Sequence, residues 1–212
     1  HGHAKVRIMY YNLLTESGPL GWHLAYTYNE TNDLTSMTDA LGRTTTYVWE
    51  GGNLVQIVRP DGTTFTYTYD EHGQMLTATD PNGNTTRFAY DDYGNLIEVR
   101  SPLDCVTQYN YDIVGRMTSM TDGNGHTMHV EYDGNDNVTR VTDPRGYHTG
   151  FEYDGNDCLV KMTDRRGGEW TYAYDDGNHP HFMTDIYDPD QDLVVSYTYD
   201  VAGRAVEEQN GA

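Results

Sequence analysis

Short stretches in which polar and apolar residues alternate recur along most of the chain, and clusters of turn-forming residues separate them. Thr63–Tyr69 and Thr85–Tyr90 are two such stretches, rich in threonine and aromatic side chains. A period of two is typical of β-strands that bury one face. The sequence Asp-Pro-Asn-Gly at 80–83 favours a tight turn between them, because these residue types adopt turn conformations readily. The pattern therefore predicts an all-β chain of short strands and tight turns.

An internal repeat of about 21 residues organises these strands. Each copy is marked by an aromatic residue followed by an acidic or amide residue, usually Tyr-Asp, and successive marks lie 21, 20, 21, 21, 21, 21, 21 and 25 residues apart. The nine aromatic positions, called the anchors below, are Tyr28, Trp49, Tyr69, Tyr90, Tyr111, Tyr132, Tyr153, Tyr174 and Tyr199. An aromatic or β-branched residue two positions earlier shares the anchor's face of the strand. We predict that the anchors form the structural core of each repeat.

The repeat predicts a ribbon of tandem β-hairpins. We expect an N-terminal flank or cap at 1–25, an array of about eight to nine repeats at 26–204 and a polar tail at 205–212. An antiparallel β-ribbon with this many strands should curl rather than stay flat. Met117 and Met120, six and nine residues after an anchor, cannot both face inward on a regular strand. A β-bulge or a strong twist between them would reconcile the two positions.

Such a ribbon ends in two strand edges. We expect unpaired strands near Tyr26 and Tyr199, because the repeat begins and ends there. Exposed edges tend to pair with other chains. This predicts edge-to-edge self-association, or capping of one edge by residues 1–25.

Composition narrows the class of protein. Thirty-three acidic and 13 basic residues give a formal net charge of −20, which disfavours nucleic acid as a partner. Aromatic residues make up 12% of the chain, too many for a wholly disordered protein. No apolar stretch approaches the roughly 18 residues of a membrane span. The chain begins with His1 and shows no signal peptide, so we expect a processed product or an excised fragment.

The repeat carries the motif Tyr-Asp-x-x-Gly-x-[Leu/Met], followed by Asp-x-x-Gly. Residues 111–122 are an especially close copy. The motif resembles the YD repeat of Rhs and teneurin-type proteins, over about 26–204. The chain is therefore identified as a fragment of the repeat shell of a bacterial Rhs or toxin-complex protein. In that family many such repeats wind a β-ribbon into a hollow spiral shell.

The resemblance implies a structural, non-enzymatic role. The chain would help to encapsulate or scaffold a C-terminal toxin or effector domain that lies outside it. Implied partners are neighbouring repeats of the parent protein and the encapsulated toxin domain, and the implied localisation is a secreted or cell-surface bacterial protein. Bacterial members end the shell with an Asp-Pro-x-Gly-Leu type cleavage signature. The similar Asp-Pro-Arg-Gly-Tyr at 143–147 lies within the array and is interpreted as an ordinary repeat turn.

A second hypothesis is an extracellular adhesion module. Tyrosine rings stack on sugar rings, and neighbouring carboxylates accept sugar hydroxyls. A tyrosine-rich repeat face could therefore bind carbohydrate or protein. A hydrolase is a more distant alternative, because the acidic residues are periodic and no nucleophile motif or matched acid pair stands out.

Metal binding is the remaining alternative. Asp188, Asp190 and Asp192 are spaced like the start of a calcium-binding EF-hand loop, but the glycine and glutamate that such a loop needs at positions six and twelve are missing. Ordinary turns are therefore the preferred interpretation, with Ca²⁺ as the alternative and no other cofactor. Two histidine pairs, His126 with His129 and His179 with His181, lack a cysteine that would complete a tetrahedral site.

Overall fold

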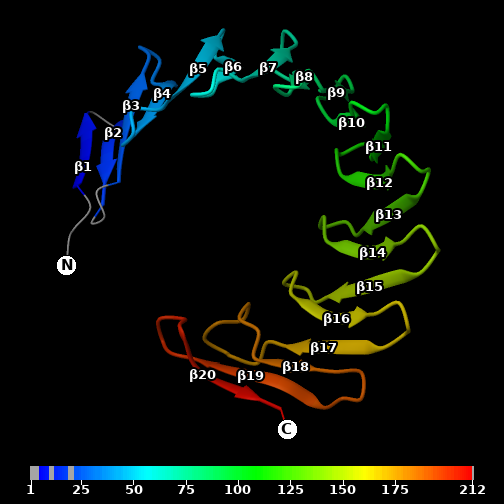
Figure 1. Ribbon diagram of the computed structural model, residues 1–212. Coiled ribbons are helices and arrows are strands. Elements are labelled where there is room, and N and C mark those ends of the chain that lie inside the picture. Colours follow the sequence, from blue (N-terminus) through cyan, green and yellow to red (C-terminus); the bar gives the residue numbers. More distant parts are fainter. Residues whose placement is uncertain (1–4, 10–11, 19–21, 212) are drawn as a thin grey trace. The chain divides into compact units, whose positions relative to one another are not determined.

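The computed structural model describes residues 5–9, 12–18 and 22–211 (Figure 1). Within these ranges every regular element is a β-strand. The chain divides into two compact units, His1–Thr107 and Gln108–Ala212. Each unit is described by itself below.

The first unit is built from ten strands. They are β1 (Lys5–Met9), β2 (Asn12–Ser17), β3 (His23–Tyr28), β4 (Leu34–Asp39), β5 (Thr44–Glu50), β6 (Asn53–Val58), β7 (Thr64–Tyr69), β8 (Met75–Thr79), β9 (Thr85–Tyr90) and β10 (Leu96–Arg100). From β1 to β10, each strand pairs antiparallel with the next one along the chain. The unit is a ladder of consecutive hairpins.

The second unit repeats this arrangement. The unit boundary lies inside β11 (Val106–Tyr111). The following strands are β12 (Met117–Thr121), β13 (Thr127–Tyr132), β14 (Val138–Thr142), β15 (His148–Tyr153), β16 (Leu159–Thr163), β17 (Glu169–Ala173), β18 (Asp185–Tyr187), β19 (Leu193–Tyr199) and β20 (Ala205–Asn210). From β11 to β20, consecutive strands again pair antiparallel.

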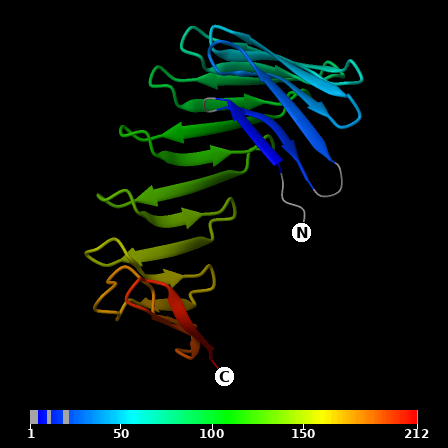
Figure 2. The same ribbon diagram turned by 90° about the vertical axis from the view of Figure 1, so that its left-hand side faces the viewer.

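The predicted all-β fold of tandem hairpin repeats in an antiparallel ribbon is confirmed. Within each unit the strand direction rotates and the ribbon bends from one hairpin to the next, so that neither unit is a flat sheet (Figures 1 and 2). This is the expected consequence of strand twist accumulating over many strands. The boundaries at 25/26 and 204/205 stay predictions, although β2 lies in the first of these flanks and β20 in the last.

The predicted β-bulge is present in each regular repeat. In the hairpin β11–β12, Tyr111 lies opposite Met117 and Asn110 lies opposite Ser119, so the intervening Thr118 has no counterpart. The same shift recurs where β7 meets β8 and where β15 meets β16. One extra residue resets the alternation of the strand, and Met117 and Met120 thereby reach the same face.

The core is thin, because the ribbon is one sheet thick. All nine anchors are half-buried, and so are the aromatic residues two positions before them. Val130, Cys158, Val195 and Ser119 are the buried side chains of the described residues, and none of these residues carries a large side chain that is fully buried. Each repeat therefore buries its aromatic rings mainly against the repeats beside it, as expected of a quasi-one-dimensional array.

The expected unpaired strands near Tyr26 and Tyr199 are wrong, whereas the alternative, capping of one edge by residues 1–25, is confirmed by the pairing of β2 with β3. Tyr26 lies in β3, which pairs with both β2 and β4. Tyr199 lies in β19, which pairs with both β18 and β20. Sheet pairing requires only main-chain groups, so strands that lack the aromatic motif extend the ladder at both places.

Candidate functional site

The tips of eight anchors reach back to the preceding hairpin. The tyrosine hydroxyl, or the indole N–H of Trp49, donates a hydrogen bond to a main-chain carbonyl oxygen, in most copies that of the residue 15 positions earlier. The donor–acceptor pairs are Tyr28–Leu13 (2.9 Å), Trp49–Leu34 (2.8 Å), Tyr69–Leu54 (2.8 Å), Tyr90–Met75 (3.0 Å), Tyr132–Met117 (2.9 Å), Tyr153–Val138 (3.0 Å), Tyr174–Leu159 (3.1 Å) and Tyr199–Met183 (2.7 Å). The ninth anchor, Tyr111, is the last residue of β11 and lies opposite Met117.

These hydrogen bonds explain why the anchors are tyrosine or tryptophan. In the regular repeats the acceptor carbonyl belongs to the residue that lies opposite the preceding anchor, as Met117 lies opposite Tyr111 and accepts from Tyr132. That carbonyl stands beside the bulge, where the regular ladder is interrupted, and it therefore needs another donor. Burial raises the pKa of Tyr153 and Tyr174, which keeps these hydroxyls protonated and able to donate.

The aspartate of most Tyr-Asp pairs closes a tight turn; after Tyr174 the turn is built on Asp176 instead of Asp175. In the turn at 70–74, Asp70 Oδ1 accepts the backbone N–H groups of His72 and Gln74, both at 2.9 Å. The N–H of Gly73 donates to the carbonyl of Asp70, and Gly73 has a φ of 80°, which glycine adopts without strain. The turn at 80–84 on the opposite edge of the ribbon has the same bonds around Asp80. Turns at both edges of the ribbon therefore use this one design.

Most of these aspartates have a further partner at the fifth turn position. The Asn84 side-chain amide donates to Asp80 Oδ2 at 2.8 Å, and Arg204 Nε donates to Asp200 Oδ2 at 2.8 Å. The Asn84 amide, joined by turn N–H groups, holds the pKa of Asp80 below its usual value, and Arg204 does the same for Asp200. These carboxylates are committed to turn structure, which leaves them poorly suited to acid–base chemistry.

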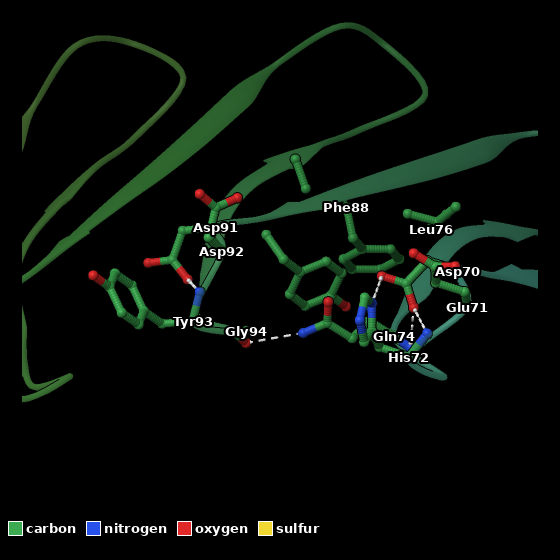
Figure 3. Close-up of a pocket in the computed structure, with 12 residues that line it drawn as sticks. Asp70, Glu71, His72, Gln74, Leu76, Phe88, Asp91, Asp92, Tyr93 and Gly94 are labelled. Carbon is green, nitrogen blue, oxygen red and sulfur yellow. Dashed lines mark hydrogen bonds and ion pairs between the residues drawn. The ribbon is translucent and has the colours of Figure 1, made fainter.

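A hollow of about 780 Å³ lies between two neighbouring Tyr-Asp turns of the first unit (Figure 3). One wall is the turn at 70–74, and the other is the turn that begins at Asp91. Leu76, Phe88 and Tyr90 line it between the turns. Tyr93 stands at its rim, with a side chain that is 92% exposed. The hollow combines carboxylates, aromatic rings and an apolar surface.

The candidate calcium ligands form a turn of the same design. Asp188 Oδ1 accepts the backbone N–H groups of Asp190 (2.9 Å) and Asp192 (3.0 Å). Gln191 takes the positive φ that glycine has in other copies. Within the part of the chain that the structure describes, no three His, Cys, Asp or Glu side chains gather closely enough to hold a metal ion. Ca²⁺ binding here stays an untested alternative.

The fold brings together Cys158 and His181, which are far apart in sequence. Cys158 Sγ lies 3.3 Å from His181 Nδ1, at the long loop between β17 and β18. Burial raises the pKa of the Cys158 thiol, and the nearby carboxylates of Asp154 and Asp157 raise it further. A nucleophilic cysteine requires the opposite shift. The contact therefore has the character of a packed thiol beside an imidazole.

Comparison with known proteins decides the family. A family model described as the RHS repeat matches residues 12–44, 28–64, 49–85, 69–104, 90–127 and 132–169, which together make up more than half of the chain. The chain belongs to the RHS repeat family. The YD-repeat resemblance of the sequence is thus confirmed. No curated protein matches the chain. In the described part of this RHS repeat chain, no helix is long and apolar enough to span a membrane.

Solved structures support the RHS repeat fold. The fold is similar to that in the crystal structure of TcdB2–TccC3–TEV, with a TM-score of 0.72 at 14% identity over 94% of this chain. It is also similar to a Tc holotoxin pore of Photorhabdus luminescens (TM-score 0.55, 15% identity, 89% of this chain) and to TcdB2–TccC3 (TM-score 0.52, 15% identity, 94%). The chain spans only 12%, 13% and 15% of those chains, respectively.

Sequence reasoning found the anchors but missed their hydrogen bonds. The missed signal is that all nine anchors are tyrosine or tryptophan, although the chain also contains four phenylalanines. Both side chains carry a polar donor at the end of an apolar ring, whereas phenylalanine does not. The hollow at Asp70–Gly94 and the contact of Cys158 with His181 carried no local signal, because each joins residues from different repeats.

Proposed function

We propose that this RHS repeat chain is a non-enzymatic wall segment of a repeat shell, which helps to encapsulate or scaffold a toxin or effector domain outside the chain. Its partners are then the neighbouring repeats of a secreted or cell-surface bacterial protein and the enclosed domain. The similarity in fold to Tc toxin structures supports this proposal. So does the share of those chains that it spans, which is that expected of one segment of a larger wall.

One observation carries the proposal: the tips of eight anchors are hydrogen-bonded to the hairpin before them. Because this contact joins only neighbouring repeats, the ribbon can be lengthened by adding further repeats. No closed core sets the number of repeats. The contact produces a wall that is one sheet thick, in which the aromatic rings are half-buried. Such a wall suits the enclosure of another domain better than it suits the formation of a deep catalytic cleft.

Protease protection in the full parent protein tests the proposal. We expect the domain that follows the repeats to be cleaved at least about tenfold more slowly in the intact protein than when it is expressed alone. Replacing Tyr132 and Tyr153 together by alanine should open the wall and remove the protection. Equal cleavage rates of the enclosed and the isolated domain would contradict the proposed role.

The adhesion alternative has less support from the geometry. The anchors supply part of the hydroxyls that a tyrosine-rich face would offer to a sugar. At Tyr69, Tyr90 and Tyr153 these hydroxyls already donate to main-chain carbonyls, and the rings are half-buried. These anchor hydroxyls are therefore engaged within the chain itself, which favours the structural proposal.

A further inference from the structure

We propose that the hollow between the turns at Asp70 and Asp91 is a binding site for a guanidinium group, namely the side chain of an arginine on a protein partner. The hollow belongs wholly to the first unit and opens at the turn edge of the ribbon (Figure 3). Four observations support this assignment: unused acceptors, an exposed ring, an internal arginine in the equivalent place two repeats later, and the charge of the chain.

The hollow contains acceptors that the chain does not use. Among the described residues, the carboxylates of Glu71 and Asp92 have no hydrogen-bond or ion-pair partner, and both residues are exposed lining residues. Asp70 Oδ2 has only the imidazole of His72, at 3.9 Å. At several other turns the corresponding oxygen is bonded by the fifth turn residue, as Asp80 is by Asn84 and Asp91 is by Asn95. Three carboxylates thus border one space without a close cation.

The same space two repeats later holds a guanidinium from the chain itself. There Arg116 Nε donates to Asp112 Oδ2 at 2.7 Å, and its Nη1 donates to the carbonyl of Asp133 (2.9 Å) and to Asp136 Oδ1 (2.8 Å). The guanidinium carbon lies 4.7 Å from the centre of the Tyr132 ring, which is a cation–π contact. This repeat position therefore has the shape and the polarity to accept an arginine head group.

The first-unit hollow lacks that arginine. Gln74 stands at the position of Arg116 and reaches the neighbouring turn through a 3.1 Å hydrogen bond from Nε2 to the carbonyl of Gly94. It is shorter and neutral, and it makes no bond to Asp70 Oδ2. The anchor Tyr90 corresponds to Tyr132 and lines the hollow. The Asp70 carboxylate, the Asp91 carbonyl and the Tyr90 ring correspond to groups that hold Arg116, Gly94 stands in the place of Asp136, and the internal cation is missing.

Electrostatics and the exposed ring favour a cation over a neutral ligand. The chain carries a formal net charge of −20, which attracts basic partners and raises their rate of encounter. Tyr93, a residue that is 92% exposed, lies beside Asp92 at the rim with its ring directed away from the turn at 70–74 (Figure 3), and it is a further aromatic side chain available to a planar guanidinium. A sugar could use the ring but would leave Glu71 and Asp92 without a counter-charge.

Nuclear magnetic resonance titration of the whole chain tests the site. The probe is N-acetyl-arginine methylamide, which has one positive charge, and its neutral isostere N-acetyl-citrulline methylamide is the matched control. We expect the arginine probe to shift the amide signals of residues 70–74 and 91–95 with a dissociation constant on the order of 1–10 mM. The citrulline probe and cellobiose should leave them in place. Equal binding of the citrulline probe, or binding of cellobiose alone, would overturn the proposal.

Exchanging the residues at the two equivalent positions makes the test sharper. Gln74→Arg should fill the hollow from within and weaken probe binding at least about tenfold, while Asn82→Arg, which adds the same charge at the opposite turn edge, should retain it. Arg116→Gln should free the acceptors of the equivalent hollow in the second unit, which Arg116 now lines, and shift the signals of residues 133–137 as well. Unchanged binding by Gln74→Arg would refute the assignment.

Substitutions at the rim keep the test independent of folding. Asp92→Asn and Tyr93→Ala change exposed turn positions, and each should weaken binding roughly two- to fivefold. Tyr147→Ala, at an exposed tyrosine of the opposite turn edge, is the control and should bind as the unaltered chain does. Equal effects of Tyr93→Ala and Tyr147→Ala would mean that the probe has no defined site.

Discussion

The two units carry different chemistry at the same place in the repeat. In the first unit, Thr68 on β7 lies opposite Thr77 on β8, and their hydroxyls are 2.6 Å apart. In the second unit, the equivalent pair is Glu152 on β15 and Lys161 on β16, an ion pair at 2.6 Å. These pairs lie on the face of the ribbon opposite to the anchors. One backbone register therefore accepts either a neutral hydroxyl pair or an ion pair.

On the anchor face the two units do not differ. Tyr69 in the first unit and Tyr153 in the second donate to carbonyls at 2.8 Å and 3.0 Å. Both are followed by an aspartate that closes a turn of the same design. The comparison teaches that the anchors and the aspartate turns specify the repeat, whereas the opposite face is free to vary.

The largest expected effect comes from removing an anchor ring in either unit. Tyr69→Ala and Tyr153→Ala should each lower the free energy of unfolding by about 2–3 kcal/mol, somewhat less than the loss of a fully buried aromatic ring. The phenylalanine variants keep the ring and should lose only about 1 kcal/mol, for the carbonyl left without its donor. Urea denaturation measures both losses. A phenylalanine variant as unstable as its alanine counterpart would show that the ring packing contributes little.

Acid should destabilise both units through their turns. The Asn84 amide holds the pKa of Asp80 below 3.8, and the backbone N–H of Arg116, joined by its side chain, does the same for Asp112. Because the folded chain favours the ionised carboxyl, this stabilisation is complete above the ordinary pKa and is lost as the pH falls through the lowered one. The melting temperature should therefore drop steeply below about pH 4.

The variant Asp80→Ala isolates one turn. It should lower the melting temperature by roughly 2–4 °C near neutral pH, and part of the loss at low pH should disappear with it. Asp92→Ala, at an aspartate that closes no turn, is the matched control and should change neither value. Identical melting curves for the two variants at every pH would argue against a turn-closing role of Asp80.

A smaller effect is expected from exchanging the face opposite to the anchors. Replacing Glu152 and Lys161 together by threonine gives the second unit the hydroxyl pair of the first. The melting temperature should change by less than roughly 2 °C, because exposed ion pairs and cross-strand hydroxyl pairs contribute similarly little. Its dependence on salt should weaken at the same time. A large loss of stability would mean that this face also specifies the fold.

The smallest effect concerns calcium. The turn interpretation of the segment from Asp188 to Asp192 predicts that Ca²⁺ and Mg²⁺ at matched ionic strength raise the melting temperature equally, by screening the net charge of −20. Calorimetry with each ion measures the difference. A much larger stabilisation by Ca²⁺, removed by Asp190→Asn, would replace the turn by a cation site.

Local patterns predicted much of this fold. The period of two located the strands, and the turn residues located the hairpins. The odd spacing of Met117 and Met120 predicted a β-bulge or a strong twist, and the register shows the bulge. These features depend on residues within one hairpin. The end of the repeat motif was a poor guide to the end of the sheet. Ala205–Asn210 lack the motif, but they form β20, which pairs with β19 through main-chain groups.

The candidate site was less predictable, because it joins different repeats. Gln74 contacts Gly94, and Arg116 contacts Asp136, each one repeat further along the chain. Whether the side chain at the fifth turn position reaches the next turn depends on the length of that side chain and on the distance between the turns. The sequence gives the length of the side chain but not the distance.

The central claim is that equivalent repeats are fastened each to the one before. Deletion of one whole 21-residue period tests this claim most directly. Removing residues 132–152 joins Glu131 to Tyr153, so that Tyr153 takes the place of Tyr132 and can donate to the carbonyl of Met117. The control deletion, 132–141, removes an anchor and its turn without restoring the register. Circular dichroism should show a cooperative melt and retained strand content for the first deletion, and loss of the cooperative melt for the second. An unfolded product of the 21-residue deletion, beside a well-folded 10-residue deletion, would contradict the account.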